Sequence, residues 1–343
     1  MTQHLRPGKL PAADLQDLLD RLDRADPRLV VGPRTGEDAA VIEMGDRVLV
    51  VATDPVTFAT DRIGAYAVHV NANDVAVLGA RPRWFFAVVL LPEATAARGQ
   101  AEAIMEDVAG ACDALGATVA GGHTEITVGL DRPVVIGQML GEVAPARLVR
   151  KTRMAPGDQV LLTRGAAIEG TAILAREMRA RLSPWLPASL LDRAADLLTD
   201  PGISIVEAAL AAADAADLHG LHDPTEGGVI AGLVELAAAS GLGLRVDEGA
   251  IPVLPETAAV CAVLGLDPLR LIASGALLVV APPGSIDPIE RALAKRGVAA
   301  RVVGELRPAG EGLQIERDGR LAPLVGPARD ELARVFEATR DRG

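Results

Sequence analysis

Short apolar runs that are typical of β-strands alternate with longer alanine-rich segments of helical periodicity along most of this chain. The strands expected in the first half are residues 39–42, 48–53, 84–91, 118–120 and 134–143. Two helices are expected between them, at 63–78 and 94–115, and each is closed by a glycine just past its end. This alternation predicts an α/β (α+β) fold, in which helices cover a sheet.

Two segments of this half carry more specific expectations. The run 84–91 has no charged interruption, which predicts a strand buried on both faces. Residues 121–132 are expected to form a loop between two strands, because they begin with a glycine pair in Gly121-Gly122-His123-Thr124-Glu125.

A change of composition divides the chain near its middle. Residues 144–158 contain Pro145, Pro156 and Gly157 together with a basic run, and a new strand at 159–163 and a new helix at 168–181 follow. Strands and helices then alternate to about residue 304. A length of 343 residues also favours two domains. We therefore expect an N-terminal domain at 1–150 and a C-terminal domain at 151–343.

The charge balance limits the partners of this protein. Acidic residues outnumber basic ones, 46 to 34, and only 2% of residues are aromatic; proteins that bind nucleic acid or anionic membranes need the opposite balance. The longest apolar run, 84–91, is far shorter than the roughly 18 residues of a membrane span, and the N-terminus lacks an apolar signal core. Two separated cysteines, Cys112 and Cys261, give no disulfide framework. A cytoplasmic protein without nucleic-acid or membrane partners is expected.

Acidic and amide side chains gather where strands and turns are expected. Glu37 and Asp38 follow Gly36 just before a strand, and Asp54 ends the next strand. Each of these is also typical of an ordinary turn or cap. Asn71 and Asp74 are harder to explain in that way, because they share one face of an apolar helix, where an unpaired polar group costs about 1–3 kcal/mol.

Mg²⁺ is a suitable shared partner for these groups. It prefers carboxylate oxygen, keeps several waters and commonly bridges to substrate phosphates. Glycines beside the acids allow backbone N–H groups to approach phosphate oxygens. Since phosphoryl transfer needs mainly charge neutralisation and positioning, the pattern is compatible with a site for ATP and Mg²⁺.

A second polar cluster, residues 219–228, precedes a helix expected at 229–239. Thr225 is a candidate cap of that helix, whose N-terminus favours an anion. A zinc site built on His219, His222 and Asp223 is a less favoured alternative. Residues 163–170 also join a strand to a helix through a glycine turn; they either present N–H groups to an anion or form an ordinary connection.

Five motifs occur in an order that identifies a family. They are Gly36-Glu-Asp-Ala-Ala-Val41, Thr53-Asp54, Asn71-Ala-Asn-Asp74 with Gly79-Ala-Arg-Pro82, Gly121-Gly-His-Thr-Glu125 and His222-Asp-Pro-Thr-Glu-Gly-Gly228. Over about residues 30–305 the chain resembles the aminoimidazole ribonucleotide (AIR) synthase-related superfamily, which includes thiamine-monophosphate kinase, selenophosphate synthetase and the hydrogenase expression/formation protein E (HypE). Residues 246–271 and the last motif look most like the HypE branch. The selenophosphate branch has a reactive residue near the N-terminus, whereas the first cysteine here is Cys112.

The resemblance implies two α/β domains and a homodimer in which the mixed sheets of the N-terminal domains pair. It places ATP in the cleft between the domains, near the dimer interface, with Mg²⁺. By match to the family motifs the implied metal ligands are Asp38, Asp54 and Asp74. The implied cofactor-binding residues are Gly36, Asp38, Asn71, Gly121, Gly122, His123 and Glu125. Asp74 and Asp223 are the implied catalytic residues, and Glu125 is the candidate replacement for the acid that some relatives have in place of His123.

The implied activity is ATP-dependent phosphorylation of an oxygen or another nucleophile of a second substrate, small or carried by a protein. The alternatives are a small-molecule kinase of the thiamine-monophosphate kinase type, a nucleotide-binding assembly or regulatory protein without turnover, and a metal-dependent hydrolase at His219 and His222. Characterised HypE proteins carry a carbamoyl group on a C-terminal cysteine. The sequence has no cysteine after Cys261, so we expect a diffusible substrate, or nucleotide binding alone, instead of thiol-carried dehydration.

Overall fold

The structure, a computed structural model, describes residues 8–10, 12–22 and 26–340, and the polar N-terminal residues 1–7 lie outside this range. Its first sheet contains six strands in the order β1-β2-β3-β6-β4-β5. In that order they are Leu29–Val31, Ala40–Glu43, Val48–Val56, Val134–Val143, Arg81–Pro92 and Thr118–Thr127. Only β4 and β5 pair in parallel, so the sheet is mixed. A short helix, α1 (Ala12–Leu19), precedes it.

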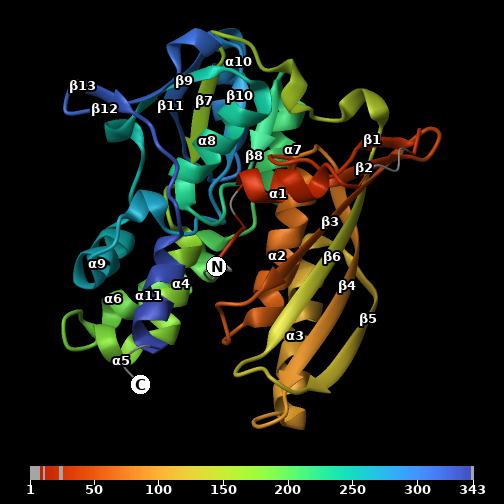
Figure 1. Cartoon of the computed structure of the whole chain (residues 1–343), viewed down its shortest axis with the longest axis vertical. Coiled ribbons are helices and arrows are strands. Elements are labelled where there is room, and N and C mark those ends of the chain that lie inside the picture. The colour runs from red at the N-terminus through yellow and green to blue at the C-terminus, as the bar shows by residue number, and fades with distance from the viewer. Residues whose placement is uncertain (1–7, 11, 23–25, 341–343) are drawn as a thin grey trace.

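Helices α2 (Ile63–Ala76) and α3 (Arg98–Leu115) pack on one face of this sheet. Glycines in β6 allow α2 to approach closely. A Cβ atom at Gly137 would lie 2.3 Å from Asn71 Nδ2, and one at Gly141 would lie 2.4 Å from Val75 Cγ1. Because α2 also contacts helix α7 (Val206–Ala215) of the second half, it lies between the first sheet and the rest of the molecule (Figure 1).

The second sheet has seven strands in the order β13-β12-β9-β11-β7-β10-β8. In that order they are Arg320–Pro323, Leu313–Arg317, Gly243–Asp247, Ala300–Arg307, Gln159–Thr163, Leu278–Ala281 and Gly220–His222. Its other helices are α4 (Ile168–Glu177), α5 (Arg179–Leu182), α6 (Ala188–Asp196), α8 (Gly228–Ser240), α9 (Pro255–Leu264), α10 (Pro283–Ala294) and α11 (Glu331–Arg340). Strands β7, β8 and β10 are almost entirely buried, as expected for strands covered on both faces.

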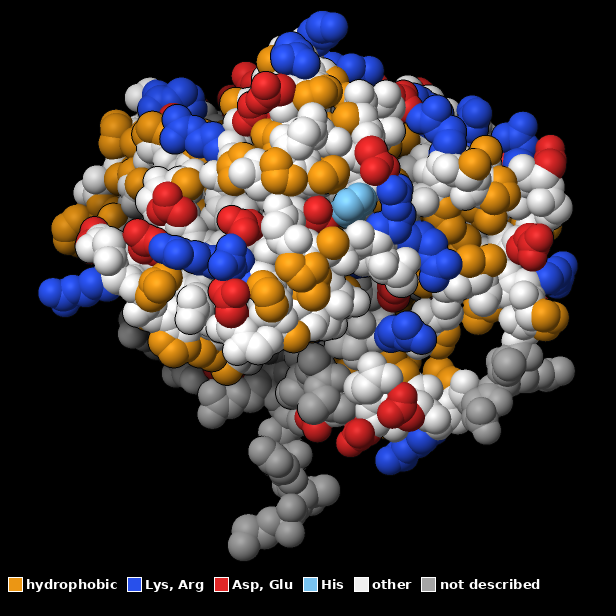
Figure 2. All heavy atoms as spheres, turned by 90° about the horizontal axis from the view of Figure 1, so that it is seen from above, with side chains coloured by type: hydrophobic (Ala, Val, Ile, Leu, Met, Phe, Trp, Pro, Cys, Tyr) orange, Lys and Arg blue, Asp and Glu red, His pale blue; other side chains and the backbone are white. Residues whose placement is uncertain are grey.

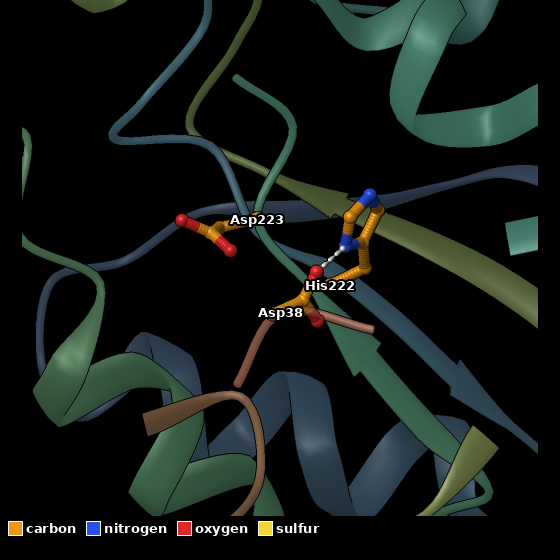
Figure 3. A group of neighbouring side chains, drawn as sticks. All are labelled: Asp38, His222 and Asp223. Carbon is orange, nitrogen blue, oxygen red and sulfur yellow. Dashed lines mark ion pairs between the residues drawn. The ribbon is translucent and has the colours of Figure 1, made fainter. Parts of the chain in front are cut away.

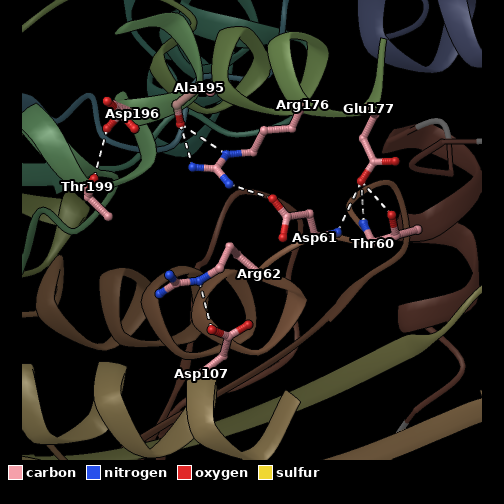
Figure 4. Close-up of polar contacts among 9 residues, drawn as sticks. All are labelled: Thr60, Asp61, Arg62, Asp107, Arg176, Glu177, Ala195, Asp196 and Thr199. Atoms are coloured by element: carbon pink, nitrogen blue, oxygen red, sulfur yellow. Dashed lines mark hydrogen bonds and ion pairs between the residues drawn. The ribbon is translucent and has the colours of Figure 1, made fainter. Parts of the chain in front are cut away.

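The two halves are joined by polar contacts at the end of α4 (Figure 4). Glu177 Oε1 accepts hydrogen bonds from the backbone N–H and the hydroxyl of Thr60, both at 2.7 Å. Arg176 pairs with Asp61 at 2.5 Å. Deeper in the interface, Asn73 of α2 donates to the Ile203 carbonyl and accepts from the Ile205 N–H, each at 2.9 Å. These contacts fix α2 and α4 on opposite sides of one cavity.

The expected α/β class is confirmed, and several boundaries differ from the sequence expectations. The segment 121–132 is not a loop throughout, because β5 continues to Thr127. Gly122 is needed there for packing, since a Cβ atom would lie 2.0 Å from the Ala87 carbonyl oxygen of β4. The expectation that residues 84–91 are buried on both faces is wrong, because burial alternates along β4 and Trp84 is 37% exposed. The helix expected at 168–181 is divided at Met178.

On the face shown in Figure 2, basic side chains are interspersed with acidic and apolar ones, so this face carries no uniform basic stripe. Among the described helices, none combines the length and the apolar composition that crossing a bilayer requires.

Candidate functional site

A cavity of about 970 Å³ lies where the two halves meet. The first half contributes the turn before β2, the end of β3 and one face of α2. The second half contributes the start of α4 and the segment between β8 and α8. Four predicted site acids, Asp38, Asp54, Asp74 and Asp223, line this single cavity. The structure thus brings together carboxylates that are up to 185 positions apart in the sequence.

Asp38 is held by two cationic partners (Figure 3). Its Oδ2 atom lies 2.8 Å from Lys151 Nζ, and its Oδ1 atom lies 2.9 Å from His222 Nδ1. Lys151 also donates to the Gly36 carbonyl oxygen at 2.6 Å, and its side chain is only 3% exposed. Burial alone would raise the pKa of Asp38, but Lys151 and His222 hold it well below its usual range. Asp38 is therefore a fixed negative charge.

His222 connects Asp38 to helix α8. Its Nε2 atom lies 3.0 Å from Glu235 Oε2. Burial and the Lys151 ammonium oppose protonation of the ring, but the carboxylates of Asp38 and Glu235 outweigh them and raise the pKa of His222 to about 9. Burial likewise opposes ionisation of Glu235, yet His222 lowers the pKa of Glu235 to about 2. Lys151, Asp38, His222 and Glu235 thus form a chain of alternating charges. This chain orients the turn containing Gly36, because Lys151 also donates to the Gly36 carbonyl.

Asp74 and Asp223 are in a different electrostatic state. They are 6% and 2% exposed, and one oxygen of Asp74 and both oxygens of Asp223 find no hydrogen-bond partner among the described residues. Burial, and after it the charge of Asp38, raises the pKa of Asp223 to about 8. Burial, Asp223 and Asp54 raise the pKa of Asp74 well above its usual range. The two carboxylates need a countercharge that the described residues do not supply.

This donor set fits a hard divalent cation. Ligand atoms of Asp38, His222 and Asp223 lie within 4.8 Å of one another, and the unpartnered oxygens belong to carboxylates, the ligands that Mg²⁺ prefers. Since His222 Nδ1 and Nε2 each face a carboxylate at about hydrogen-bonding distance, the ring is better suited to orienting Asp38 than to binding zinc. The carboxylates that remain for a cation are Asp54, Asp74 and Asp223, with Asp38 beside them.

Asn71 does not line the cavity but positions a residue that does. Its Oδ1 accepts from the Asp54 backbone N–H at 2.8 Å, and its Nδ2 donates to the carbonyls of Ala67 at 2.8 Å and Asp54 at 3.3 Å. The amide is thereby fully engaged with the backbone. Asn71 fixes the end of β3, and so the place of the Asp54 carboxylate, by contacts within the chain.

Two strands, β6 and β4, separate Asp54 on β3 from the motif residues Gly121, Gly122, His123 and Glu125. They belong to β5, the edge strand, are exposed, and are not among the residues that line the cavity. His123 and Glu125 instead approach each other, with 3.4 Å between Nε2 and Oε2. Within one chain the structure does not bring this motif to the site.

Two expectations for residues 219–228 differ from the structure. His219 pairs with Asp158 at 2.7 Å and does not line the cavity, so the two histidines do not form one site. Thr225 does not cap α8; its hydroxyl accepts from Lys9 Nζ at 3.0 Å, and the residue before the helix is Gly227. The Gly227 N–H donates to buried Asp330 at 2.5 Å, which ties this turn to the start of α11.

Sequence reasoning missed Lys151 and Glu235 as site residues. Lys151 belongs to a basic run that is typical of a solvated linker, and Glu235 is a single acid in an apolar helix. The side-chain partners of Lys151 lie 71 or more positions away in the sequence, and His222, the partner of Glu235, lies 13 positions away. The one available signal was the presence of a charge where the surrounding pattern predicts burial.

Comparisons with known proteins agree with this geometry. The models described as "AIR synthase related protein, N-terminal domain" and "C-terminal domain" match residues 36–143 and 155–316. A carbamoyl dehydratase HypE of Cupriavidus necator is 33% identical over 288 residues, which are 80% of this chain and 77% of the relative. One of Rhizobium leguminosarum is 30% identical over 283 residues, with the same two shares.

Solved structures give the same assignment. Escherichia coli HypE superposes with a TM-score of 0.73 at 25% identity, over 94% of this chain and 99% of that one. A HypE crystallised in complex with ATP has a TM-score of 0.67 at 25% identity, over 96% and 98% of the two chains. Thiamine monophosphate kinase of Aquifex aeolicus, at 18% identity and a TM-score of 0.69, shares the fold. The resemblance drawn from the motifs is confirmed, including its HypE branch, and the chain belongs to the AIR synthase-related protein family.

Proposed function

We propose that this protein binds ATP with Mg²⁺ in the cavity between its halves and uses it to phosphorylate an oxygen or another nucleophile of a second substrate, as a hydrogenase maturation-like enzyme of the cytoplasm. The observation that carries the proposal is the pair of buried carboxylates, Asp74 and Asp223, with unpartnered oxygens in one large cavity. Relatives support it, because they include HypE proteins, one of them crystallised with ATP.

The described residues take distinct parts in this proposal. Asp54, Asp74 and Asp223 would hold Mg²⁺, which supplies charge neutralisation for the phosphates when bound. Lys151 and His222 keep Asp38 ionised and fix the Gly36 turn, whose backbone would face the nucleotide. Asp74 and Asp223 remain the proposed catalytic residues, because their carboxylates lie at the cavity wall contributed by both halves.

A homodimer is part of the proposal. Strand β5 is an open sheet edge, and the sheet face opposite α2 and α3 exposes the apolar side chain of Trp84, which is 37% exposed. An open edge beside an exposed apolar face is a pairing surface. Pairing there would place His123, Glu125 and the two preceding glycines at the interface. We propose that they contribute to nucleotide binding from that position.

The burial of both cysteines favours a diffusible second substrate, as in the small-molecule kinase alternative. Cys112 and Cys261 are 1% and 2% exposed, and burial raises their pKa values to about 11 and about 12. A thiol in this state is a poor nucleophile at neutral pH. Neither cysteine is therefore suited to carry an acyl group into the cavity.

Melting temperatures test nucleotide binding. Mg²⁺–ATP at 100 times its dissociation constant is expected to stabilise the wild type by about 2.7 kcal/mol, and ATP with EDTA by much less. Asp74→Asn should remove most of the gain, whereas the exposed matched control Asp113→Asn should keep it. An undiminished shift in Asp74→Asn refutes the metal assignment. Phosphate release from ATP with candidate substrates then separates turnover from nucleotide binding alone.

A further inference from the structure

Part of the cavity wall is apolar and is not used by the phosphate-binding proposal. We call it the apolar chamber and define it by Val56, Phe58, Val70, Ile173, Ile272 and Phe336, all of which line the cavity. Val70 lies one helical turn before Asp74 on α2, so the chamber begins about 6 Å along the helix from the carboxylates. The ring centres of Phe58 and Phe336 are 5.9 Å apart, and Phe336 belongs to α11.

Two buried polar groups from the second half line the same cavity. Glu169 is 4% exposed and Ser274 is 0% exposed. The Ser274 N–H donates to Glu169 Oε2 at 3.3 Å, while the Ser274 hydroxyl has no hydrogen-bond partner in the part of the chain that the structure describes. None of the ion pairs found among those residues involves Glu169, and burial raises the pKa of its carboxyl to about 7. The cavity therefore presents a buried carboxyl and a hydroxyl to a ligand.

The charge around the cavity decides which ligand these groups suit. Among the described lining residues ten are acidic and three, Lys9, Arg34 and Arg132, are basic. Lys9 donates to Thr225, and Arg34 lies two residues from Gly36, at the carboxylate end. Arg132 lies with its guanidinium carbon 5.7 Å from the centre of the Phe336 ring. An anion would meet repulsion in a cavity of this charge, and a planar cation, Arg132, already lies against the Phe336 ring of its wall.

We infer that the apolar chamber binds the second substrate as an organic cation, an amidinium or ammonium on an apolar body, whose head pairs with Glu169 and donates a hydrogen bond to the Ser274 hydroxyl. The identification of this ligand as the second substrate rests on the proposed function. A volume of about 970 Å³ is at the upper end for one small-molecule site, which leaves room beside a nucleotide. The cation supplies the countercharge that burial denies Glu169.

A matched ligand series tests the inference. Benzamidine, benzamide and benzoate share one ring and differ in carrying a cationic, a neutral or an anionic head. In isothermal titration calorimetry of the full chain, benzamidine should bind with higher affinity than benzamide, and benzoate should not bind. Glu169→Gln should weaken the binding of benzamidine at least tenfold, because it removes a charge-assisted hydrogen bond. The exposed control Glu106→Gln should leave it unchanged, and Ser274→Ala should weaken it by a smaller factor.

The same variants distinguish this inference from the proposed function. Glu169→Gln should retain the melting shift with Mg²⁺–ATP, which also shows that it is folded, whereas Asp74→Asn should lose that shift and still bind benzamidine. If benzamidine binds but the wild type shows no melting shift with Mg²⁺–ATP, the cation site is supported and the phosphoryl-transfer proposal fails. The inference is overturned if benzoate binds as well as benzamidine, if none of the three binds, or if both Glu169→Gln and Ser274→Ala bind benzamidine like the wild type.

Discussion

Replacing Glu169 with glutamine should stabilise the protein at alkaline pH much more than at acidic pH. The carboxyl is fully buried, and burial raises its pKa from 4.5 to about 7, although hydrogen bonding by Ser274 lowers it in part. The folded protein thus binds this proton more tightly than the unfolded chain does. Stability linked to Glu169 is complete below pH 4.5 and is lost as the pH rises through about 7.

The size of the effect follows from the difference between the two pKa values. At about 1.4 kcal/mol per pKa unit, the raised pKa of Glu169 destabilises the folded state by about 1 kcal/mol at pH 5 and about 3 kcal/mol at pH 8. Glutamine keeps the shape and a hydrogen-bond acceptor for Ser274 but does not ionise. The stability of Glu169→Gln relative to the wild type should therefore rise by about 2 kcal/mol between these two pH values.

Urea denaturation at pH 5 and pH 8, without nucleotide, measures this difference. Titration of the other buried acids is common to both proteins and cancels to first order in the comparison. Glu106→Gln, which alters an exposed acid on α3, is the control and should show no comparable dependence on pH. A relative stability of Glu169→Gln that is the same at both pH values, within about 0.5 kcal/mol, would refute a buried and unpaired Glu169.

Three further predictions concern other parts of the molecule. Lys151→Met should destabilise the protein by about 3–5 kcal/mol in urea denaturation, because it removes one partner of the buried Asp38 carboxylate; a loss below about 1 kcal/mol would contradict the ion pair. Light scattering should show a dimer at micromolar concentration and a monomer for Trp84→Lys, and a monomeric wild type would exclude the proposed interface. Cys112 and Cys261 should resist maleimide labelling in the native protein and become labelled in urea, as measured by intact mass spectrometry. A carbamoyl adduct on either cysteine after incubation with ATP and a carbamoyl donor would instead support the thiol-carried reaction.

The sequence predicted the fold wherever a local pattern determines the structure. Helix α2 ends near its expected boundary because its apolar content and Gly79 are local signals. Strand β5 was missed beyond residue 120 because two adjacent glycines are typical of a turn. In the structure Gly122 is required by the close parallel packing on β4, a contact over more than 30 residues. Burial of β4 was overestimated because an apolar sheet face that faces away from the domain core has the same composition as one inside it.

The site could be predicted only on its acidic side. Asp54, Asp74 and Asp223 follow strand ends or interrupt an apolar helix, so each leaves a local signal, and the structure places all three in one cavity. Lys151 leaves none, because its contact with Asp38 joins residues 113 positions apart. The motif that contains His123 was recognised in the sequence, but its position on the edge strand depends on the pairing of β4 with β5.

The contrast between Asp38 and its neighbours explains how one cavity can bind both a nucleotide and a second molecule. Lys151 and His222 give Asp38 its countercharge within the chain, so its charge is the same whatever the cavity binds. The described residues offer no such partner to Asp74 and Asp223, or to Glu169. Each of these acidic groups therefore gains stability from a positive group brought by its own ligand. Since a bound cation lowers the negative potential of the shared cavity, Mg²⁺ should weaken binding of an organic cation when it arrives without nucleotide, and ATP should restore it by carrying the compensating negative charge.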